Sequence, residues 1–449
     1  MAQYRKDLNQ FLPQEKTLFE TVMIADRYGN VIGGANPSGT AVDAFGRARM
    51  STPLTMFDSS HRYRDNGLWV TSNTSGNSTV TFSANEGLIN MAVTTAANAE
   101  VIRETTKVFS YQPGKSLQIL NTFVMAPAQT NLRQRVGYYG ANNGIYLELA
   151  NNTLYLVERS YVTGNVTETR VAQSNWNIDT MDGTNTGAWT ENPPTANRNP
   201  SGRTLDISKA QISYIDVEWL GLGSVRCGFI IDGQLIPCHT FHHANYITST
   251  YITTASLPLR YEIKNIGVTA NSSTLKQVCS SIVSEGGYEL RGSQQAVGTP
   301  VEGPKDLGTT LGADIPIVSI RLKSDRLDAI VIVTALSLLC VGNNARVKWK
   351  VIKNGTLANT TWTSASADSS VEYDLTANTI TGGTTLASGF ATATTQASIS
   401  TDILKEALFK FQLERNGLTG TAFPITVTMA TAFASDDGLA TIDWEEISR

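Results

Sequence analysis

Apolar and polar side chains alternate along most of this chain, whereas apolar residues at helical spacing are rare. In RVKWKV (346–351), apolar side chains fall on one face and cations on the other, which is typical of a half-buried strand. The segments ISYIDVEW (212–219), ITVTM (425–429) and ATIDW (440–444) alternate in the same way, and turn sequences such as Asp232-Gly233 separate such segments. Many short strands joined by turns predict an all-β chain built from antiparallel sheets.

Composition divides the chain into four parts. Residues 1–60 hold one predicted hairpin, with a strand near 21–25, and are expected to form an N-terminal arm that docks onto another surface. Residues 61–290 contain the longest series of strands, and we expect them to form an antiparallel β-sandwich. A turn-rich linker at 291–314 leads to a second, smaller β-sandwich at 315–449.

Two segments test the all-β interpretation. Residues 400–407 begin with a helix-capping pattern and predict a short helix of about two turns. The longest apolar run, 329–341, is shorter than the roughly 20 residues that a membrane helix needs. It is rich in Ile and Val and therefore predicts a buried strand and no membrane span. Residues 1–7 lack the apolar stretch of a secretory signal, so we expect synthesis in a cytoplasm.

Charge limits the classes of partner. Of the 449 residues, 16% are charged and the formal net charge is −4. An average soluble domain has roughly 25% charged residues. This balance gives no general attraction to phosphate, so nucleic acid is excluded as a main partner. The four cysteines are too few for a disulfide scaffold.

The Asp232-Gly233 hairpin can be analysed in detail. Its two-residue loop favours a type I′ turn, which pairs Ile231 with Gln234 and Cys227 with Cys238. Two cysteines directly opposite each other lie about 5.5 Å apart at Cα, and that distance permits a disulfide. In a reducing cytoplasm two buried thiols are the other outcome, and both stay open.

The string CHTFHH at 238–243 has the side chains of a metal site. If it continues a strand, Cys238 and His242 share a face but lie about 13 Å apart, and His239 and His243 use the other face. One strand cannot close a zinc site, which needs every ligand atom within about 2.0–2.3 Å of the ion. We therefore predict histidines that line a sheet face or loop, with no metal and no cofactor.

Asp216 and Glu218 form the best acidic pair. At alternate positions of a strand they point the same way, about 7 Å apart at Cα, and could flank a sugar ring. The stretch resembles the E-x-D-x-E strand of jelly-roll glucanases, but Tyr214 stands where that pattern has its first Glu. One catalytic carboxylate is thus missing, and a solvated row of carboxylates is the alternative. The sequence predicts no enzyme.

The polar insertion at 182–203 is long enough to be either functional or flexible. It contains Trp189, whose ring could stack on a sugar, whereas Trp69, Trp176 and Trp362 are expected in the core. Trp189, Asp216 and Glu218 are therefore the candidate glycan-binding residues. The sequence contains no phosphate-binding loop and no recognisable nucleophile with its base.

Several short segments of the chain resemble structural proteins of tailed bacteriophages, particularly large phages of aquatic bacteria. The matching segments are AFGRARMSTP (44–53), MFDS (56–59), RVGY (135–138), NNGI (142–145), SNWNID (174–179), MDG (181–183), DVEWLG (216–221), HTFH (239–242), LPLRYEI (257–263) and IDWEE (442–446). The resemblance implies a virion component with a concanavalin-like jelly roll and no assigned enzyme activity. The expected fold class is all-β, with a jelly-roll domain, an N-terminal arm and a second, smaller β-sandwich.

The resulting hypothesis is a non-enzymatic structural protein of a tailed-phage virion, made in the bacterial cytoplasm. Head decoration, neck, baseplate and fibre positions are all open. Its partners would be other virion proteins and copies of itself, because a sparsely charged surface is easily desolvated on assembly. The alternative is an adhesin that binds host-surface glycan, and a third reading is a glycan-degrading enzyme that uses Asp216 and Glu218.

Overall fold

The computed structural model describes residues 24–25, 31–32, 52–184, 199–289, 291–342, 345–393, 410–434 and 436–447. These residues form antiparallel strands and one 3-10 turn, η1 (Gln173–Asn175), and none of them is in an α-helix, which confirms the all-β prediction. The helix predicted at 400–407 lies outside them. No helix within them has the length and hydrophobicity needed to cross a membrane.

The chain divides into two compact units, residues 1–52 and 53–449. In the first unit, β1 (Ile24–Ala25) pairs with β2 (Val31–Ile32) in antiparallel register. This pairing confirms the hairpin that the sequence predicts near residues 21–25.

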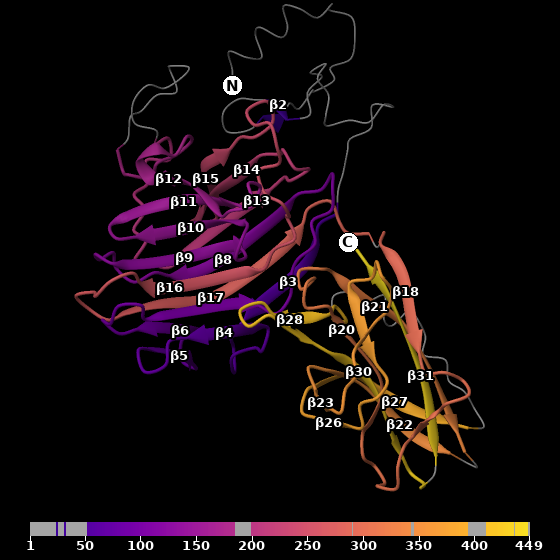
Figure 1. The fold of residues 1–449 in the computed structure, drawn as a ribbon. Coiled ribbons are helices and arrows are strands. Elements are labelled where there is room, and N and C mark those ends of the chain that lie inside the picture. Colours follow the sequence, from indigo (N-terminus) through magenta and orange to yellow (C-terminus); the bar gives the residue numbers. More distant parts are fainter. Residues whose placement is uncertain are drawn as a thin grey trace, which may run out of the picture. The chain divides into compact units, whose positions relative to one another are not determined.

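The second unit begins with a jelly-roll β-sandwich of two antiparallel sheets, coloured indigo to pink in Figure 1. The seven-stranded sheet has the order β12 (Thr167–Ala172), β11 (Thr153–Ser160), β10 (Gly144–Ala150), β9 (Leu132–Tyr139), β16 (Leu259–Asn265), β7 (Glu100–Thr105), β4 (Trp69–Asn73). The eight-stranded sheet has the order β15 (Gln234–Phe241), β14 (Val225–Ile231), β13 (Gln211–Val217), β8 (Leu117–Val124), β17 (Ser273–Ser284), β6 (Leu88–Val93), β5 (Ser78–Ser83), with β3 (Leu54–Ser60) also paired to β17.

Alternation places one face of each sheet in a shared core. On β8, every second residue from Leu117 to Phe123 faces inward, and Ile119 and Phe123 are fully buried. On β9, Val136 and Tyr138 meet them from the other sheet in the same hydrophobic cluster. The opposite faces of the two sheets are therefore free to carry polar side chains.

The structure corrects two boundaries drawn from composition. Residues 54–60 fall in the predicted arm, yet β3 pairs with β17 from Leu54 opposite Ser284 to Ser60 opposite Cys279. Met56 and Phe57 of β3 are buried in the jelly-roll core, which explains why this strand joins the sheet.

The predicted linker 291–314 also contains strands. β18 (Ser293–Gly298) and β19 (Lys305–Asp306) both pair with β31 (Asp437–Glu446). Their sequences are short and polar, and they lack the alternation by which a strand is recognised.

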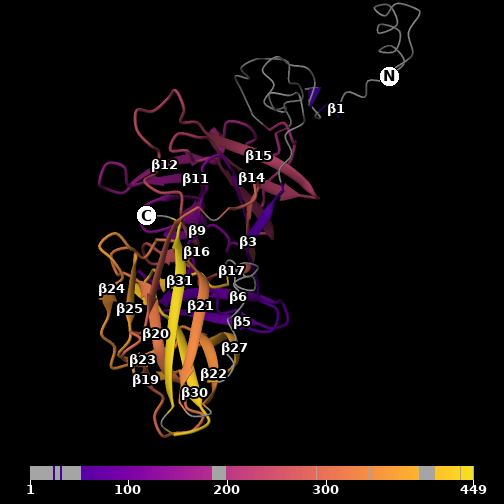
Figure 2. The ribbon, with the colours of Figure 1, turned by 90° about the vertical axis from the view of Figure 1, so that its right-hand side faces the viewer.

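The smaller β-sandwich packs a second core between a four-stranded and a six-stranded sheet, seen from the side in Figure 2. In the four-stranded sheet β31 lies between β18 and β21 (Val331–Val341), the strand predicted from the longest apolar run, and also pairs with β19. The six-stranded sheet has the order β24 (Thr363–Ser364), β25 (Val371–Asp374), β20 (Ile315–Leu322), β30 (Ile425–Thr431), β22 (Arg346–Lys353), β27 (Thr384–Thr392). Two small two-stranded sheets complete the described part of this sandwich. β23 (Thr356–Ala358) pairs with β26 (Thr379–Thr381), and β28 (Glu414–Asn416) forms a hairpin with β29 (Thr421–Phe423).

Hydrogen bonds from the segment around β28 reach the jelly roll just beyond β7. The backbone N–H of Arg415 donates to the carbonyl of Thr106 at 2.9 Å, and its guanidinium pairs with Glu104 at 2.8 Å. The amide of Gln412 donates to the carbonyl of Val108 at 2.7 Å. These contacts are polar and specific, so they fix β28 against one strand end of the larger sandwich.

The Asp232-Gly233 hairpin forms as predicted near its turn and departs from the prediction further away. Ile231 pairs with Gln234, and both loop residues have the positive φ of a type I′ turn, 52° and 73°. A bulge then shifts the register so that Cys227 lies opposite His239 instead of Cys238. The predicted pairing of the two cysteines is therefore wrong, and both are buried free thiols in the structure.

Candidate functional site

On the eight-stranded sheet, alternate residues of β13, β14 and β15 face away from the core. Ile215 packs in the core, so its neighbour Asp216 points to the opposite face. The register sets Arg226 of β14 opposite Asp216, and Thr240 of β15 opposite Arg226. A polar row thus crosses three neighbouring strands.

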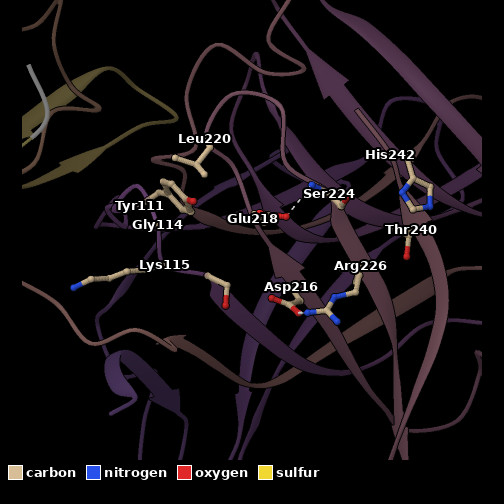
Figure 3. A pocket seen from close by; sticks show the side chains of 11 residues that line it. Tyr111, Gly114, Lys115, Asp216, Glu218, Leu220, Ser224, Arg226, Thr240 and His242 are labelled. Carbon is tan, nitrogen blue, oxygen red and sulfur yellow. Dashed lines mark hydrogen bonds and ion pairs between the residues drawn. The ribbon is translucent and has the colours of Figure 1, made fainter. Parts of the chain in front are cut away.

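A second polar row lies nearer the strand ends. The backbone N–H of Glu218 donates to the carbonyl of Ser224 at 3.2 Å, which continues the pairing of β13 with β14 past Val217. The two rows line a groove with a volume of about 600 Å³. We call it the jelly-roll groove; its lining residues are Tyr111, Gly114, Lys115, Ser116, Asp216, Glu218, Leu220, Ser224, Arg226, Thr240 and His242 (Figure 3).

The acidic pair predicted from the sequence lies in this groove. Arg226 donates a hydrogen bond to Asp216 at 2.5 Å; the Asp216 side chain is 12% exposed and that of Arg226 is 62% exposed. Burial raises the pKa of Asp216, and the charges of Glu285 and Glu218 raise it further against the opposing effect of Arg226. Glu218 is exposed and accepts a bond from the Ser224 N–H at 3.4 Å. Glu218 and Arg226 both keep hydrogen-bonding capacity for a ligand.

Tyr111 and Leu220 give the groove an apolar wall. The Tyr111 ring packs edge-on against Trp219, with centroids 5.8 Å apart. Leu220 is 56% exposed and has a φ of 41°, a left-handed conformation that is strained for a bulky residue. The Trp219 carbonyl holds this turn, because it accepts hydrogen bonds from the backbone N–H groups of Leu222 and Gly223. An exposed leucine in a strained turn beside a groove is the kind of feature that ligand sites retain.

His243 ties the same turn to the other sheet. Its Nδ1 lies 2.6 Å from the Gly223 carbonyl, its Nε2 lies 2.7 Å from a Glu158 carboxylate oxygen, and its ring stacks on Tyr251 at 3.9 Å. Burial would lower the pKa of His243, but its bonds to Glu158 and Gly223 outweigh burial and raise it. Since an ionised carboxylate and a carbonyl both accept, the geometry favours the doubly protonated ring.

Tyr214 occupies the position where the glucanase-like pattern requires a glutamate. It is 3% exposed, and a Cβ at Gly228 would lie 2.7 Å from its Cε1 atom, so the ring covers the glycine on the neighbouring strand. A buried phenol that packs on the sheet replaces a carboxylate there. The groove therefore lacks one acid of that pattern.

The other residues considered in the sequence have separate surroundings. Trp189 lies outside the residues that the structure describes. His242 lines the groove, whereas His239 is buried and accepts a bond from the Asn177 N–H at 3.2 Å. Burial and the nearby His242 lower the pKa of His239 to about 4. Among the described residues, no group of three or more His, Cys, Asp or Glu side chains is arranged to hold a metal.

The seven-stranded sheet carries a very different polar face, which we call the charged face. It comprises Arg133, Arg135, Glu148, Arg159, Glu168, Arg170 and Glu262. Arg135 of the central strand β9 bonds Glu148 at 2.6 Å and also lies within 3.4 Å of Glu168. Arg135 is only 5% exposed, because strands flank β9 on both sides.

Arginines dominate the electrostatics of the charged face. Burial alone would raise the pKa of Glu262, but Arg133, at 2.6 Å, and Arg135 hold it below its usual value. Glu148 is fully buried between Arg135 and Arg170. Every carboxylate named for this face has an arginine partner, so its negative charges are all paired within the protein.

The sequence identifies Asp216 and Glu218 as candidate ligand-binding residues and predicts His242 on a sheet face or loop, but it does not identify the other residues of the jelly-roll groove. Arg226 was within reach, because a β13–β14 hairpin with a bend at 219–223 brings residue 226 opposite 216. The sequence could not place Tyr111, Lys115 and Ser116 in the groove. They lie just before β8, which pairs with β13 about a hundred residues further along the chain. No local pattern carries that register.

No protein-family model matches this sequence, and no curated protein matches it significantly. Among solved structures, the chain is similar to a β-glucanase of Bacillus licheniformis, with 11% identity and a TM-score of 0.32 over 50% of this chain and 96% of that chain. Arcelin-5, a lectin-like defence protein from Phaseolus vulgaris, is similar with 7% identity and a TM-score of 0.29, over 53% of this chain and 100% of that chain. A legume lectin-like domain from Entamoeba histolytica is similar with 8% identity and a TM-score of 0.28, over 51% of this chain and 97% of that chain. Likenesses with TM-scores this low carry no argument about this chain.

Proposed function

We propose that this protein binds glycan non-catalytically in the jelly-roll groove. The observation that carries the proposal is the pair of polar rows, which aligns carboxylate, guanidinium and hydroxyl groups on one open sheet face. A binding site of this kind combines a concave surface with a few converging polar groups and an apolar wall.

The chemistry of the groove suits a chain of sugar hydroxyls. Each hydroxyl both donates and accepts, and the groove offers acceptors on Glu218, donors on Arg226 and groups that do both on Ser224 and Thr240. The apolar side of a sugar ring can lie on the exposed Leu220, beside the edge of the buried Tyr111. Two carboxylates line the groove together with one lysine and one arginine, so these four charges balance and favour a neutral glycan.

Binding fits this groove better than hydrolysis. Glycoside hydrolysis uses two carboxyl groups on either side of the scissile bond, one of them free to act as acid. Here Tyr214 supplies no carboxylate, and Asp216 is engaged by Arg226. Glu218 is then the one acid with free access to a bound sugar, and we assign it to binding.

A glycan array followed by titration calorimetry tests the proposal. Glu218→Gln keeps the shape and removes the charge, and we expect its dissociation constant for the best array ligand to rise about tenfold. Glu302→Gln is the matched control, because it makes the same change at an exposed site in the smaller sandwich. Equal affinities of Glu218→Gln and wild type, or release of reducing ends by the wild type, would refute non-catalytic binding here.

The resemblance to tailed-phage proteins supports a finer proposal about where binding takes place. We propose that the chain is a virion component that meets glycan on a host surface, with other virion proteins and copies of itself as partners. Deleting residues 1–52 should abolish incorporation into particles; the deletion stops there because β3 belongs to the sheet. Normal incorporation of this truncated chain would count against the docking role of the arm.

A further inference from the structure

The smaller sandwich has a second groove, whose chemistry differs from that of the jelly-roll groove. Arg346, Lys348 and Lys350 alternate along β22, so their side chains share one face of the sheet at intervals of about 7 Å. They line a groove of about 800 Å³ together with Leu311, Phe390 and Ala430. We call this surface the cationic groove.

Two of the three cations are unpaired within the described part of the chain. Lys350 lies 2.6 Å from Asp314, which neutralises it. Arg346 and Lys348 make no ion pair there; the Arg346 guanidinium lies 4.8 Å from the centre of the Phe433 ring. Net positive charge therefore remains on a protein whose formal net charge is −4.

An exposed aromatic ring stands directly beside these cations. Phe390 of β27 pairs in register with Lys348, and 76% of its surface is exposed. Among the residues that the structure describes, β27 is the edge strand of its sheet, and none of their strands lies beyond it. A single exposed ring is normal on a protein surface, but here it lies in the same groove as the cations, so the groove combines an apolar face with positive charge.

We propose that the cationic groove binds an acidic polysaccharide, with a sugar ring stacked on Phe390 and its carboxylate held by Lys348 and Arg346. An aromatic face accommodates the C–H side of a sugar, and charge-assisted hydrogen bonds bind a carboxylate strongly. The proposal is independent of the jelly-roll groove, because no residue lines both.

Charge complementarity favours this occupant over the other candidates. A nucleic acid depends on neutralising many phosphates, and two free cations on an acidic protein provide little of that attraction. In a two-fold pairing of this face with itself, a second copy of this chain would bring its own cations to the same place. One sugar unit of an acidic glycan can be bound by a few cations, which pair with its carboxylate, and one aromatic ring, on which it stacks. The cationic groove has both.

Titration calorimetry of the full chain with polygalacturonate tests the proposal, with a neutral β-glucan and an oligo-dT strand as comparison probes. We expect polygalacturonate to bind and its affinity to fall with added salt. The double variant Arg346→Gln/Lys348→Gln should weaken binding about tenfold or more, and Phe390→Ala about fivefold. Lys209→Gln and Tyr63→Ala, which alter an exposed cation and an exposed ring elsewhere, should leave binding unchanged.

Four results would overturn the proposal: no binding of polygalacturonate, equal binding of the double variant and wild type, stronger binding of oligo-dT than of polygalacturonate, or a change of oligomeric state in Phe390→Ala. Circular dichroism of each variant controls for folding. Glu218→Gln should bind polygalacturonate normally, so a failure of the jelly-roll groove and a failure of the cationic groove are distinguishable.

Discussion

The two sheets of the jelly roll both carry charges on their outward faces, but they use them differently. On the charged face, the fully buried Glu148 touches two arginines, and Arg135 touches three glutamates. In the jelly-roll groove, Asp216 has one arginine partner, and Glu218 accepts one weak bond from a backbone N–H. The same alternation thus produces a network of paired charges on one sheet and polar groups with spare hydrogen-bonding capacity on the other.

The difference teaches how to recognise function among polar side chains on a sheet. Groups whose hydrogen-bonding capacity is fully used within the protein contribute to stability, and their removal leaves buried charges unpaired. Groups that keep spare capacity beside an apolar wall remain available to a ligand. The comparison therefore predicts large stability effects on the charged face and small ones in the groove.

The largest effect is expected for Glu148→Gln on the charged face. The substitution removes the shared partner of Arg135 and Arg170 in a fully buried site, so the free energy of unfolding should fall by about 3 kcal/mol. Urea denaturation measures this free energy of unfolding for the variant and the wild type. Glu218→Gln, the same change in the groove, should stay within about 0.5 kcal/mol of wild type. Similar losses in the two variants would remove the distinction between the faces.

An intermediate effect is expected for His243→Phe. Phenylalanine keeps the stacking on Tyr251 but loses the bonds to Glu158 and Gly223, which should lower the free energy of unfolding by about 2 kcal/mol. Because the pKa of His243 is raised in the folded state, its charge contributes fully below the unfolded value of about 6.5. The contribution is lost as the pH rises through the folded pKa.

Unfolding measured across this pH range separates charge from packing. The gap between wild type and His243→Phe should be wide in mildly acidic solution and narrow in alkaline solution. A gap that stays constant with pH would mean that the ring acts by packing alone.

The smallest effect is expected for Leu220→Asn at the rim of the groove. Asparagine tolerates a positive φ, so relief of the left-handed strain should raise the free energy of unfolding by about 0.5 kcal/mol. Glycan affinity should fall, because the apolar wall loses its exposed leucine. A destabilised Leu220→Asn variant would show that the conformation is not strained.

Local features of this fold are predictable from the sequence, and long-range ones are not. Ile231 opposite Gln234 follows from the two-residue turn between them. The predicted pairing of Cys227 with Cys238, a few residues further on, is wrong because a bulge shifts the register there. A bulge depends on packing, which the type of turn does not determine. Asp216 and Glu218 were found together because they share one strand pattern, whereas Lys115 needed the register of β8 against β13. β3 was missed because four of the seven residues of LTMFDSS are polar and β17, its partner, lies more than two hundred residues away.

The pairing of β3 with β17 also bears on how the jelly roll could be rearranged. Leu54 and Ser284, the first and last strand residues of that domain, lie opposite each other in the ladder. A module whose entry and exit points adjoin can be inserted into another protein's loop or excised from one without stretching the host. It can also be circularly permuted by a short linker between these ends, with new termini opened at an exposed turn such as Asp232-Gly233.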